Sequence, residues 1–463
     1  MSTLALILLL GAGPSLSIDA DRMLSINDRR MFVIGLYENP TDDARLDEVA
    51  KAGFNLVQSG ADAAALDRLH ARGLYAWINT GSAIDLSEDP ETRSSALSAM
   101  AQEFGAHPAL ITWEVPDEAL WNVWYGATMW RRSREIRDQN ALIDALPDES
   151  ARTRLRELRR QAEEYYRLGE FAKGEQTADA IWREMGKTPP HPEWNLSNAP
   201  ERAAKMAQGM IEGYKLLRRL DPQRPVWMNH APRNSVAQRT LFNRAADVVG
   251  CDIYPVPPNQ IEHSDLADRS LSCVGAYTRT MQEAAPNKPV WMVLQGFAWA
   301  DLRESAARQE REKLRPPTYD ETRFMGFDAI VNGARGILYW GTAYTDKDKP
   351  FYGDLLRFVR ELADLQPVLS AEDSTLTLHV HLDETWGSLD RGVRVLAKDA
   401  PDGVWVLVVN EWSDPLRYTL HGLDGLNGTT YRDPVAGVEA AVKEGALSHA
   451  IPAFGVHVLR PSP

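Results

Sequence analysis

The sequence predicts a (β/α)₈ barrel followed by a smaller β-sandwich. From residue 31 to about residue 365, short apolar stretches alternate with amphipathic stretches of helical period, which is typical of a parallel sheet with crossover helices. After residue 373 the pattern changes to short alternating strands separated by turn residues, which favours an antiparallel sandwich. A chain of 463 residues is long enough for a barrel of roughly 250 residues or more and an accessory domain.

Eight apolar stretches are the candidate barrel strands, and a helical stretch follows each of them. They are Phe32–Tyr37, Phe54–Gln58, Tyr75–Asn79, Leu110–Glu114, Val226–His230, Val248–Asp252, Val290–Gln295 and Gly336–Trp340. Gly53 and Gly73 supply C-caps for the first two helices. Eight such units close into a barrel whose active site lies in the loops after the strands. We therefore place the barrel at residues 24–370 and the sandwich at residues 371–463.

The fourth unit of the barrel is oversized. Residues 122–200 are rich in Lys, Arg and Glu with helical periodicity, which predicts a helical hairpin inserted after the fourth strand. Mixed charge at this spacing usually marks a solvated helix face, and we expect that for Arg131, Arg132 and Arg134. Because the insertion leaves the active-site face, it could also form one side of the cleft.

The amino terminus, residues 1–23, contains an apolar run from Leu4 to Gly13 followed by small and polar residues. This run resembles the core of a signal peptide and is too short to span a bilayer. We therefore expect a secreted or periplasmic protein without a membrane span. A buried amino-terminal segment is the alternative reading.

The net charge and the number of cysteines exclude some classes of binding partner and cofactor. The net charge of −14 argues against nucleic acid or an anionic membrane as partner. Cys251 and Cys273 are too few for a disulfide framework, and no Cys/His cluster has the spacing of a zinc site. We expect neither a metal nor a cofactor. The sequence carries no signal for the oligomeric state.

The most informative stretch is residues 110–121, Leu-Ile-Thr-Trp-Glu-Val-Pro-Asp-Glu-Ala-Leu-Trp. Pro116 ends the strand and lifts Asp117 and Glu118 beyond its carboxyl end. Indole faces stack on pyranose rings, and a partly desolvated Glu has a pKa high enough to donate a proton to a leaving oxygen. This combination favours a carbohydrate as substrate. A solvated acidic loop is the alternative.

Six segments of the chain, in their order and spacing, resemble bacterial glycoside hydrolases that combine a (β/α)₈ barrel with a C-terminal β-sandwich. Trp113–Glu118 is similar to the Trp-x-x-x-Asp-Glu-Pro motif after the fourth strand, with Ala119 in place of the final proline. The resemblance covers nearly the whole chain outside residues 122–200. The other matching segments are Leu24–Tyr37, Pro289–Phe297, Arg315–Arg323, Gly333–Trp340 and Ala453–Arg460.

The resemblance implies that Glu118 is the general acid/base. Related barrels with two glutamates carry their nucleophile at the end of the seventh strand, where this chain has Gln295. An amide cannot form a glycosyl ester, so the second carboxylate must lie elsewhere. We select Asp252 at the end of the sixth strand, with Glu38 as the alternative. Glu114 is a further carboxylate, but alternation places it on the face opposite Trp113.

Other residues at the strand ends are candidates for substrate contact, each with an ordinary structural role as the alternative. Trp121 and Trp124 follow the acid motif and could line the same cleft. The candidate set is Glu38, Trp113, Asp117, Asn229, His230, Tyr254, Gln295, Trp299 and Trp340.

The sequence thus predicts a glycoside hydrolase that cleaves O-glycosidic bonds of an oligo- or polysaccharide. One alternative is a non-catalytic carbohydrate-binding protein on a hydrolase scaffold, which Gln295 favours. Another is a transglycosylase or lyase on the same barrel, because this fold supports many chemistries.

Overall fold

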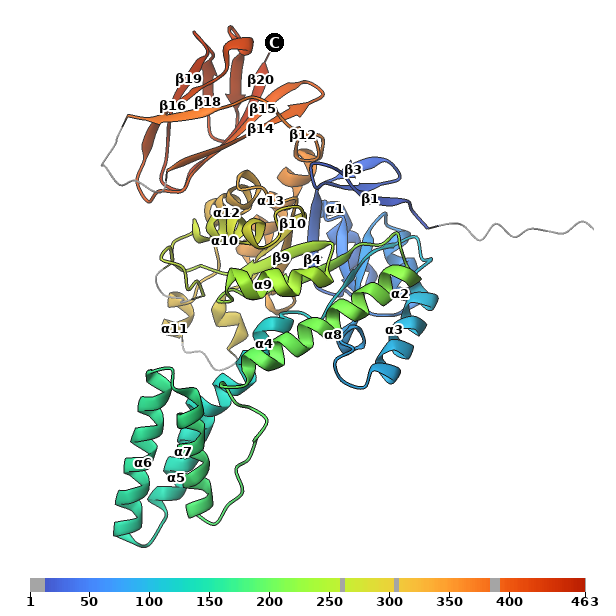
Figure 1. Ribbon diagram of the computed structural model, residues 1–463. Helices are drawn as coiled ribbons and strands as arrows, with labels where there is room; N and C mark the ends of the chain where they lie inside the picture. Colours follow the sequence, from blue (N-terminus) through green and yellow to red (C-terminus); the bar gives the residue numbers. More distant parts are fainter. Residues whose placement is uncertain (1–12, 259–262, 304–307, 384–391, 463) are drawn as a thin grey trace, which may run out of the picture.

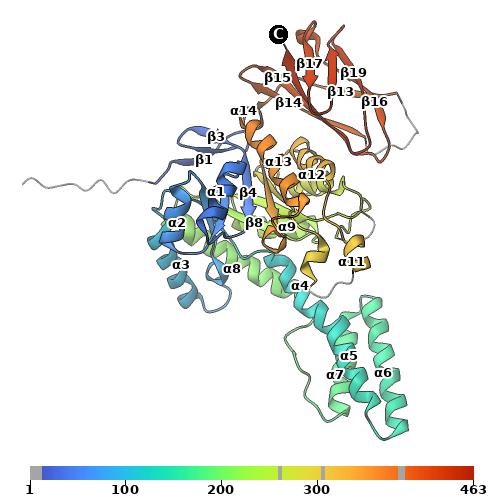
Figure 2. The same ribbon diagram turned by 180° about the vertical axis from the view of Figure 1, so that it is seen from behind.

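The computed structural model describes residues 13–258, 263–303, 308–383 and 392–462. Eight parallel strands form a closed barrel in the order β10-β11-β4-β5-β6-β7-β8-β9, which confirms the predicted fold class. The sandwich lies at one end of the molecule and a helical insertion at the other (Figures 1 and 2). The barrel strands are β4 (Val33–Tyr37), β5 (Leu56–Ser59), β6 (Tyr75–Asn79), β7 (Leu110–Glu114), β8 (Val226–His230), β9 (Val248–Ile253), β10 (Val290–Gln295) and β11 (Gly336–Trp340).

Helices surround the barrel, as the repeated pattern predicted. Their N-caps follow from sequence; for example, Thr318 and Glu321 form a reciprocal capping box at the start of α12. Two short helices, α11 (Arg308–Lys313) and α14 (Gln366–Leu369), supplement the set. The main outer helices are α1 (Asp43–Ala52), α2 (Ala63–His70), α3 (Pro90–Phe104), α8 (Ala199–Leu220), α9 (Val236–Phe242), α10 (Cys273–Ala284), α12 (Tyr319–Val331) and α13 (Pro350–Asp364).

Large aromatic side chains fill the barrel interior. Trp227 contacts both Trp77 and Trp291, with ring centroids 5.4 and 5.7 Å apart, and all three are fully buried. Gly250 makes room for them, because a Cβ there would lie 2.2 Å from the Trp291 carbonyl oxygen. The interior is therefore a packed core rather than a channel, and ligands can bind only at its ends.

A small antiparallel sheet closes the amino end of the barrel. It consists of β1 (Leu16–Ile18), β2 (Leu24–Ile26) and β3 (Arg29–Met31). Leu24 and Ile26 belong to the same buried cluster as Val33 of β4, the first residue of its strand. Residues 1–12, which hold all but the last residue of the apolar run from Leu4 to Gly13, lie outside the described residues, and secretion stays a prediction.

The C-terminal domain consists of two antiparallel sheets, ordered β12-β14-β15-β20-β17-β18 and β13-β16-β19. It packs against α10 and α12 of the barrel, where Phe324 meets Phe454 and Arg279 pairs with Glu411 at 2.7 Å. Its strands are β12 (Glu372–Asp373), β13 (His379–Leu382), β14 (Val393–Ala400), β15 (Gly403–Asn410), β16 (Leu416–His421), β17 (Thr430–Asp433), β18 (Val438–Ala441), β19 (Ala446–Ile451) and β20 (Val456–Ser462).

The insertion after β7 is larger than the predicted hairpin. It continues from α4 (Ala119–Met129) through a π-helical turn, Trp130–Arg134, into three helices that project away from the barrel (Figures 1 and 2). Of this segment, α4 contacts the barrel strand β8, whereas the three further helices contact one another. These helices are α5 (Glu135–Asp144), α6 (Glu149–Arg167) and α7 (Phe171–Glu184).

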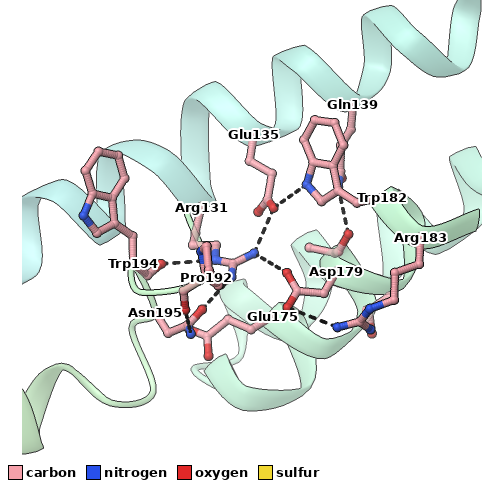
Figure 3. A network of polar contacts seen from close by, with 12 residues as sticks. Arg131, Glu135, Gln139, Glu175, Asp179, Trp182, Arg183, Pro192, Trp194 and Asn195 are labelled. Atoms are coloured by element: carbon pink, nitrogen blue, oxygen red, sulfur yellow. Dashed lines mark hydrogen bonds and ion pairs between the residues drawn. The ribbon is translucent and has the colours of Figure 1, made fainter. Parts of the chain in front are cut away.

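Arg131 corrects one expectation from sequence, because it is buried at the centre of the insertion rather than solvated. Its guanidinium pairs with Glu135 and Asp179 at 2.8 Å each and donates to the Trp194 carbonyl at 3.2 Å (Figure 3). The π-turn directs this side chain inward, whereas Arg132 and Arg134 are exposed as expected. The network joins α5 and α7 to the segment that returns to the barrel.

We predict that Arg131→Ala destabilises the insertion by about 3–5 kcal/mol, because it leaves the fully buried Glu135 without its ion-pair partner. Arg132→Ala is the matched control on the exposed face and should change stability by less than ~0.5 kcal/mol. Hydrogen exchange of α5–α7 measures both. Equal protection in the two variants would contradict a central role for Arg131.

Candidate active site

We call the end of the barrel at which the strands finish its mouth. The loop after β7 presents the side chains of Asp117 and Glu118 there. Glu118 is the residue before α4 and has a left-handed backbone, with φ 50° and ψ 33°. A non-glycine residue in this region stores of order 1–3 kcal/mol of strain. Its carboxylate forms no capping bond to α4 among the described residues, so it is available to other groups.

Glu118 lies next to Asp252, which projects into the barrel from β9. His263, which lines the same cavity as Glu118, has its Nε2 3.9 Å from Asp252 Oδ2. Burial, and then repulsion from Asp117, raise the pKa of Glu118 to about 7, although the interaction with Asp252 opposes this shift. Burial, and then the charge of Glu118, raise the pKa of Asp252 well above its ordinary value. The pair therefore holds two protons below about pH 7 and one proton above it, and its two groups titrate as a unit. The sequence-predicted carboxylates thus lie together.

Glu114 lies beneath this pair and faces the barrel interior. It accepts hydrogen bonds from the Tyr37 hydroxyl, from Trp77 Nε1 at 3.0 Å and from Asn79 Nδ2 at 2.8 Å. Burial, and then the neighbouring Asp117, raise the pKa of Glu114 to about 8 despite these donors. Sequence reasoning left Tyr37 out, although it is the last inward-facing residue of its strand and strand alternation could have found it.

Trp113 is placed on the opposite face of β7, so the structure does not support its expected contact with substrate. Its ring packs among the outer helices, and its Nε1 donates to Asp221 at 2.9 Å. Alternation allows only one of Trp113 and Glu114 to face inward, and the inward position goes to the carboxylate.

Asp117 and Asn229 lie together at the mouth, where Asn229 Nδ2 donates to Asp117 Oδ1 at 3.0 Å. Burial raises the pKa of Asp117, and the bonds from Asn229 and Tyr37 oppose this effect. His230 faces the other way and lies 2.8 Å from Asn243, between β8 and the helix layer. Burial lowers the pKa of His230 to about 4, so it is neutral and does not reach the mouth.

Gln295 faces the barrel interior at the end of β10, but its amide is fully occupied by backbone. Its Oε1 accepts from Val256 N at 3.0 Å, and its Nε2 donates to Val256 O at 2.9 Å and Phe297 O at 3.1 Å. A carboxylate could not donate to these two carbonyl groups. Gln295 therefore holds the loop after β9 in place and is not free to contact substrate.

Glu38 is likewise engaged. It pairs with Arg45 at 3.2 Å and Lys347 at 3.5 Å, and it accepts a bond from Thr342 Oγ1 at 2.6 Å. Burial opposes ionisation of Glu38, but the bonds from Arg45 and Thr342 outweigh burial and lower its pKa. A carboxylate held by two cations is a structural anchor between β4 and the loop after β11.

Aromatic rings line the other side of the mouth. Tyr254 stacks on Trp340, with centroids 5.5 Å apart, and on His263 at 4.9 Å. Trp299 donates from Nε1 to the Tyr254 carbonyl at 3.3 Å and contacts Phe297. The structure thus brings Tyr254, Trp299 and Trp340 together, with Tyr254 buried between His263 and Trp340. A role of Trp299 and Trp340 as sugar platforms stays a prediction.

A cavity of about 170 Å³ opens directly beside Glu118. Its remaining lining comes from α4 and from the loops after β8 and β9: Trp121, Ala231, Pro232, Arg233 and His263. Burial, and then the charge of Arg233, lower the pKa of His263 to about 3, so the imidazole is neutral. Sequence reasoning missed Arg233 and His263, because both lie in loops without periodicity.

Within residues 13–258, 263–303, 308–383 and 392–462, no group of three or more His, Cys, Asp or Glu side chains is arranged to hold a metal ion. Over the same ranges, no helix is both long enough and apolar enough to cross a membrane. Cys251 and Cys273 are both buried.

The fold and the mouth define a barrel-plus-sandwich architecture that solved glycoside hydrolases share. One structure described as a glycoside hydrolase has a TM-score of 0.51 and 12% identity, with 96% of each chain covered. The β-galactosidase from Bacillus circulans sp. alkalophilus gives 0.51 and 10%, covering 93% of this chain and 99% of that one. A glycoside hydrolase family 5 protein from Bacteroides vulgatus gives 0.51 and 12%, covering 96% and 93%. At these identities the likeness shows the fold.

No protein-family model and no curated protein sequence matches the chain.

The role of Gln295 leads to a stability prediction. Gln295→Glu should destabilise the barrel by about 3 kcal/mol at neutral pH, because a buried carboxylate would face two carbonyl groups. The loss should shrink as the pH falls towards 4, since a protonated carboxyl can donate to Val256 again. Urea unfolding at several pH values measures this effect.

Gln238→Glu is the matched control, because Gln238 sits in the capping box of α9, where either side chain is accepted. A Gln295→Glu protein as stable as the control at neutral pH would show that the amide is dispensable.

Proposed function

We propose that the protein is a glycoside hydrolase in which Glu118 and Asp252 are the catalytic pair. The observation that carries the proposal is the placement of these two carboxyl groups next to one another at the mouth of a barrel and beside a cavity, where the pair keeps one proton above about pH 7. Hydrolysis of a glycosidic bond needs one protonated and one ionised carboxyl group at the scissile bond. A pair that shares a proton supplies both at once.

Glu118 is the member of the pair that donates the proton to the leaving oxygen. It lines the cavity, whereas Asp252 is only 2% exposed. When the proton moves to the glycosidic oxygen by way of Glu118, the bond from that oxygen to the anomeric carbon breaks. Asp252 then carries the negative charge that faces the positively charged anomeric carbon.

The mutual influence of the two carboxyl groups on their pKa values favours retention, because it requires that they lie close together. Retaining enzymes hold their carboxyl groups at roughly 5–5.5 Å and inverting enzymes at about 6.5–9.5 Å, since the latter must admit a water molecule between them. In a retaining cycle Asp252 forms an ester with the anomeric carbon, and Glu118 then takes a proton from the water that cleaves that ester.

Gln295 does not take part in the chemistry, because its amide is bound to backbone on both sides. This occupancy removes the main support for a non-catalytic binding protein. The glutamine stabilises a loop, and the second carboxylate that hydrolysis needs is supplied from β9 instead.

We predict that Glu118→Gln lowers activity at least ~10²-fold on substrates with poor leaving groups, which need a proton donor. The loss should be smaller on aryl glycosides with acidic leaving groups, which depart without protonation. Steady-state kinetics on both substrate types measure the difference. Near-wild-type turnover on the poor leaving group would eliminate the assignment.

We predict that Asp252→Asn abolishes most activity and that azide restores part of it as a glycosyl azide. Glu38→Gln is the comparison, and its loss should be smaller because Glu38 is held by Arg45 and Lys347. The products are identified by mass spectrometry. Full activity of Asp252→Asn together with an inactive Glu38→Gln would transfer the role to Glu38.

We predict that kcat/KM falls as the pH drops below about 7, because the pair then takes up a second proton and no longer offers an ionised carboxylate. Activity should also fall at high pH, when the last proton leaves the pair and no proton donor remains. A pH profile on a substrate that needs protonation tests both limbs. A rate that stays flat down to about pH 5 would mean that the pair does not supply the ionised carboxylate.

A further inference from the structure

Two rows of aromatic side chains lead away from the carboxyl pair. The first, the α4 row, consists of Trp121 and Tyr125. The second, the β11 row, consists of Tyr254, Trp340 and Tyr344. Each row begins at the pair and ends in an exposed tyrosine, 45% exposed for Tyr125 and 58% for Tyr344.

The α4 row follows from helix geometry. Glu118 is the residue that precedes α4, and positions 121 and 125 lie three and seven residues further, on the same face. Trp121 lines the cavity beside Glu118. Its ring centroid lies 5.8 Å from that of Tyr125, with the planes inclined by 33°. The row therefore continues the cavity outward along the helix.

The β11 row starts at Tyr254, which faces the interior two residues after Asp252. Tyr254 stacks on Trp340 with the ring planes 17° apart, and Trp340 contacts Tyr344 with centroids 5.7 Å apart. Tyr254 is only 6% exposed and also stacks on His263, so it supports the row from below. Trp340 and Tyr344 are the rings of this row that a ligand can reach.

The barrel order places the two rows on opposite sides of the mouth. In the closed ring β10-β11-β4-β5-β6-β7-β8-β9, the strand that leads into α4 is β7, four strands from β11. Strand β9, which carries Asp252, is two strands from each. A ligand that contacts both rows must therefore cross the mouth over the carboxyl pair.

We propose that a saccharide chain lies lengthwise across the mouth, on both aromatic rows, and is cut internally rather than from one end. This inference rests on the proposed function. Aromatic faces on both sides give sugar units a platform before and after the scissile bond. The α4 row, next to the proton donor Glu118, holds the leaving part of the chain, and the β11 row holds the part beyond Asp252.

The first experiment compares two measurements on the full chain. Soluble cellulose, xylan, mannan, galactan and β-1,3-glucan derivatives are screened together with a panel of aryl monoglycosides. On any polymer that is cleaved, viscosity and new reducing ends are followed in parallel. Internal cleavage gives a steep fall in viscosity at few new ends, with oligosaccharides as the first products.

The second experiment tests the rows. Tyr125→Ala and Tyr344→Ala should each lower kcat/KM about fivefold on a long oligosaccharide, with a loss that grows with chain length, since each removes one stacked ring. Tyr125→Phe and Tyr344→Phe keep the ring and should restore most of the activity. Leu168→Ala removes an equally exposed apolar side chain from the insertion and is the matched control.

The outcomes separate the two proposals. Release of single sugars with unchanged viscosity, or equal losses at all chain lengths, would overturn internal cleavage while leaving glycoside hydrolysis intact. Absence of activity on every polymer and every aryl glycoside would overturn the proposed function, and internal cleavage with it. Thermal melting of each variant shows whether a loss comes from unfolding instead, and the phenylalanine variants then decide.

Discussion

Two neighbouring carboxyl groups in a buried setting cannot both be ionised at neutral pH, and the mouth of the barrel is organised around this constraint. Glu118 and Asp252 satisfy it by sharing a proton, and Asp117 beside them strengthens the demand. Glu114, which lies deeper in the barrel, is also buried, and it accepts hydrogen bonds from three donors that stabilise its charge. The strained backbone at Glu118 is the conformation that brings its side chain to Asp252, so electrostatics and local geometry depend on each other.

The aromatic interior makes this arrangement possible. Trp77, Trp227 and Trp291 exclude water from the centre of the barrel. This raises the free energy needed to ionise the carboxyl groups at the mouth. The same rings fix positions: Trp77 donates to Glu114, and Gly336 leaves room for the Trp291 ring, because a Cβ there would lie 2.8 Å from its Cδ1 atom. The core thus sets the proton affinity of the site as well as the stability of the fold.

The fold was predictable because strand and helix periods repeat eight times, and each repeat supports the next. The pairing of Glu118 with Asp252 was predictable in kind, since both follow strands whose carboxyl ends meet at one edge. Alternation alone left the choice between Trp113 and Glu114 open. Arg131 could not be placed, because a single π-turn rotates its side chain from the surface to the interior. Arg233 and His263 carry no periodic signal, so only the folded loops bring them to Glu118.

The small sheet β1–β3 affects how substrate, water and product reach and leave the site. Leu24 and Ile26 close the amino end of the barrel, and tryptophans fill its centre. In the described part of the chain, the barrel is therefore accessible only from its mouth. Incoming water, arriving saccharide and departing product must all use it. A saccharide chain lying across the mouth would leave only its edges for the water that completes a turnover. The order of events is then fixed: the leaving part of the saccharide chain must dissociate from the α4 side of the mouth before the water can enter.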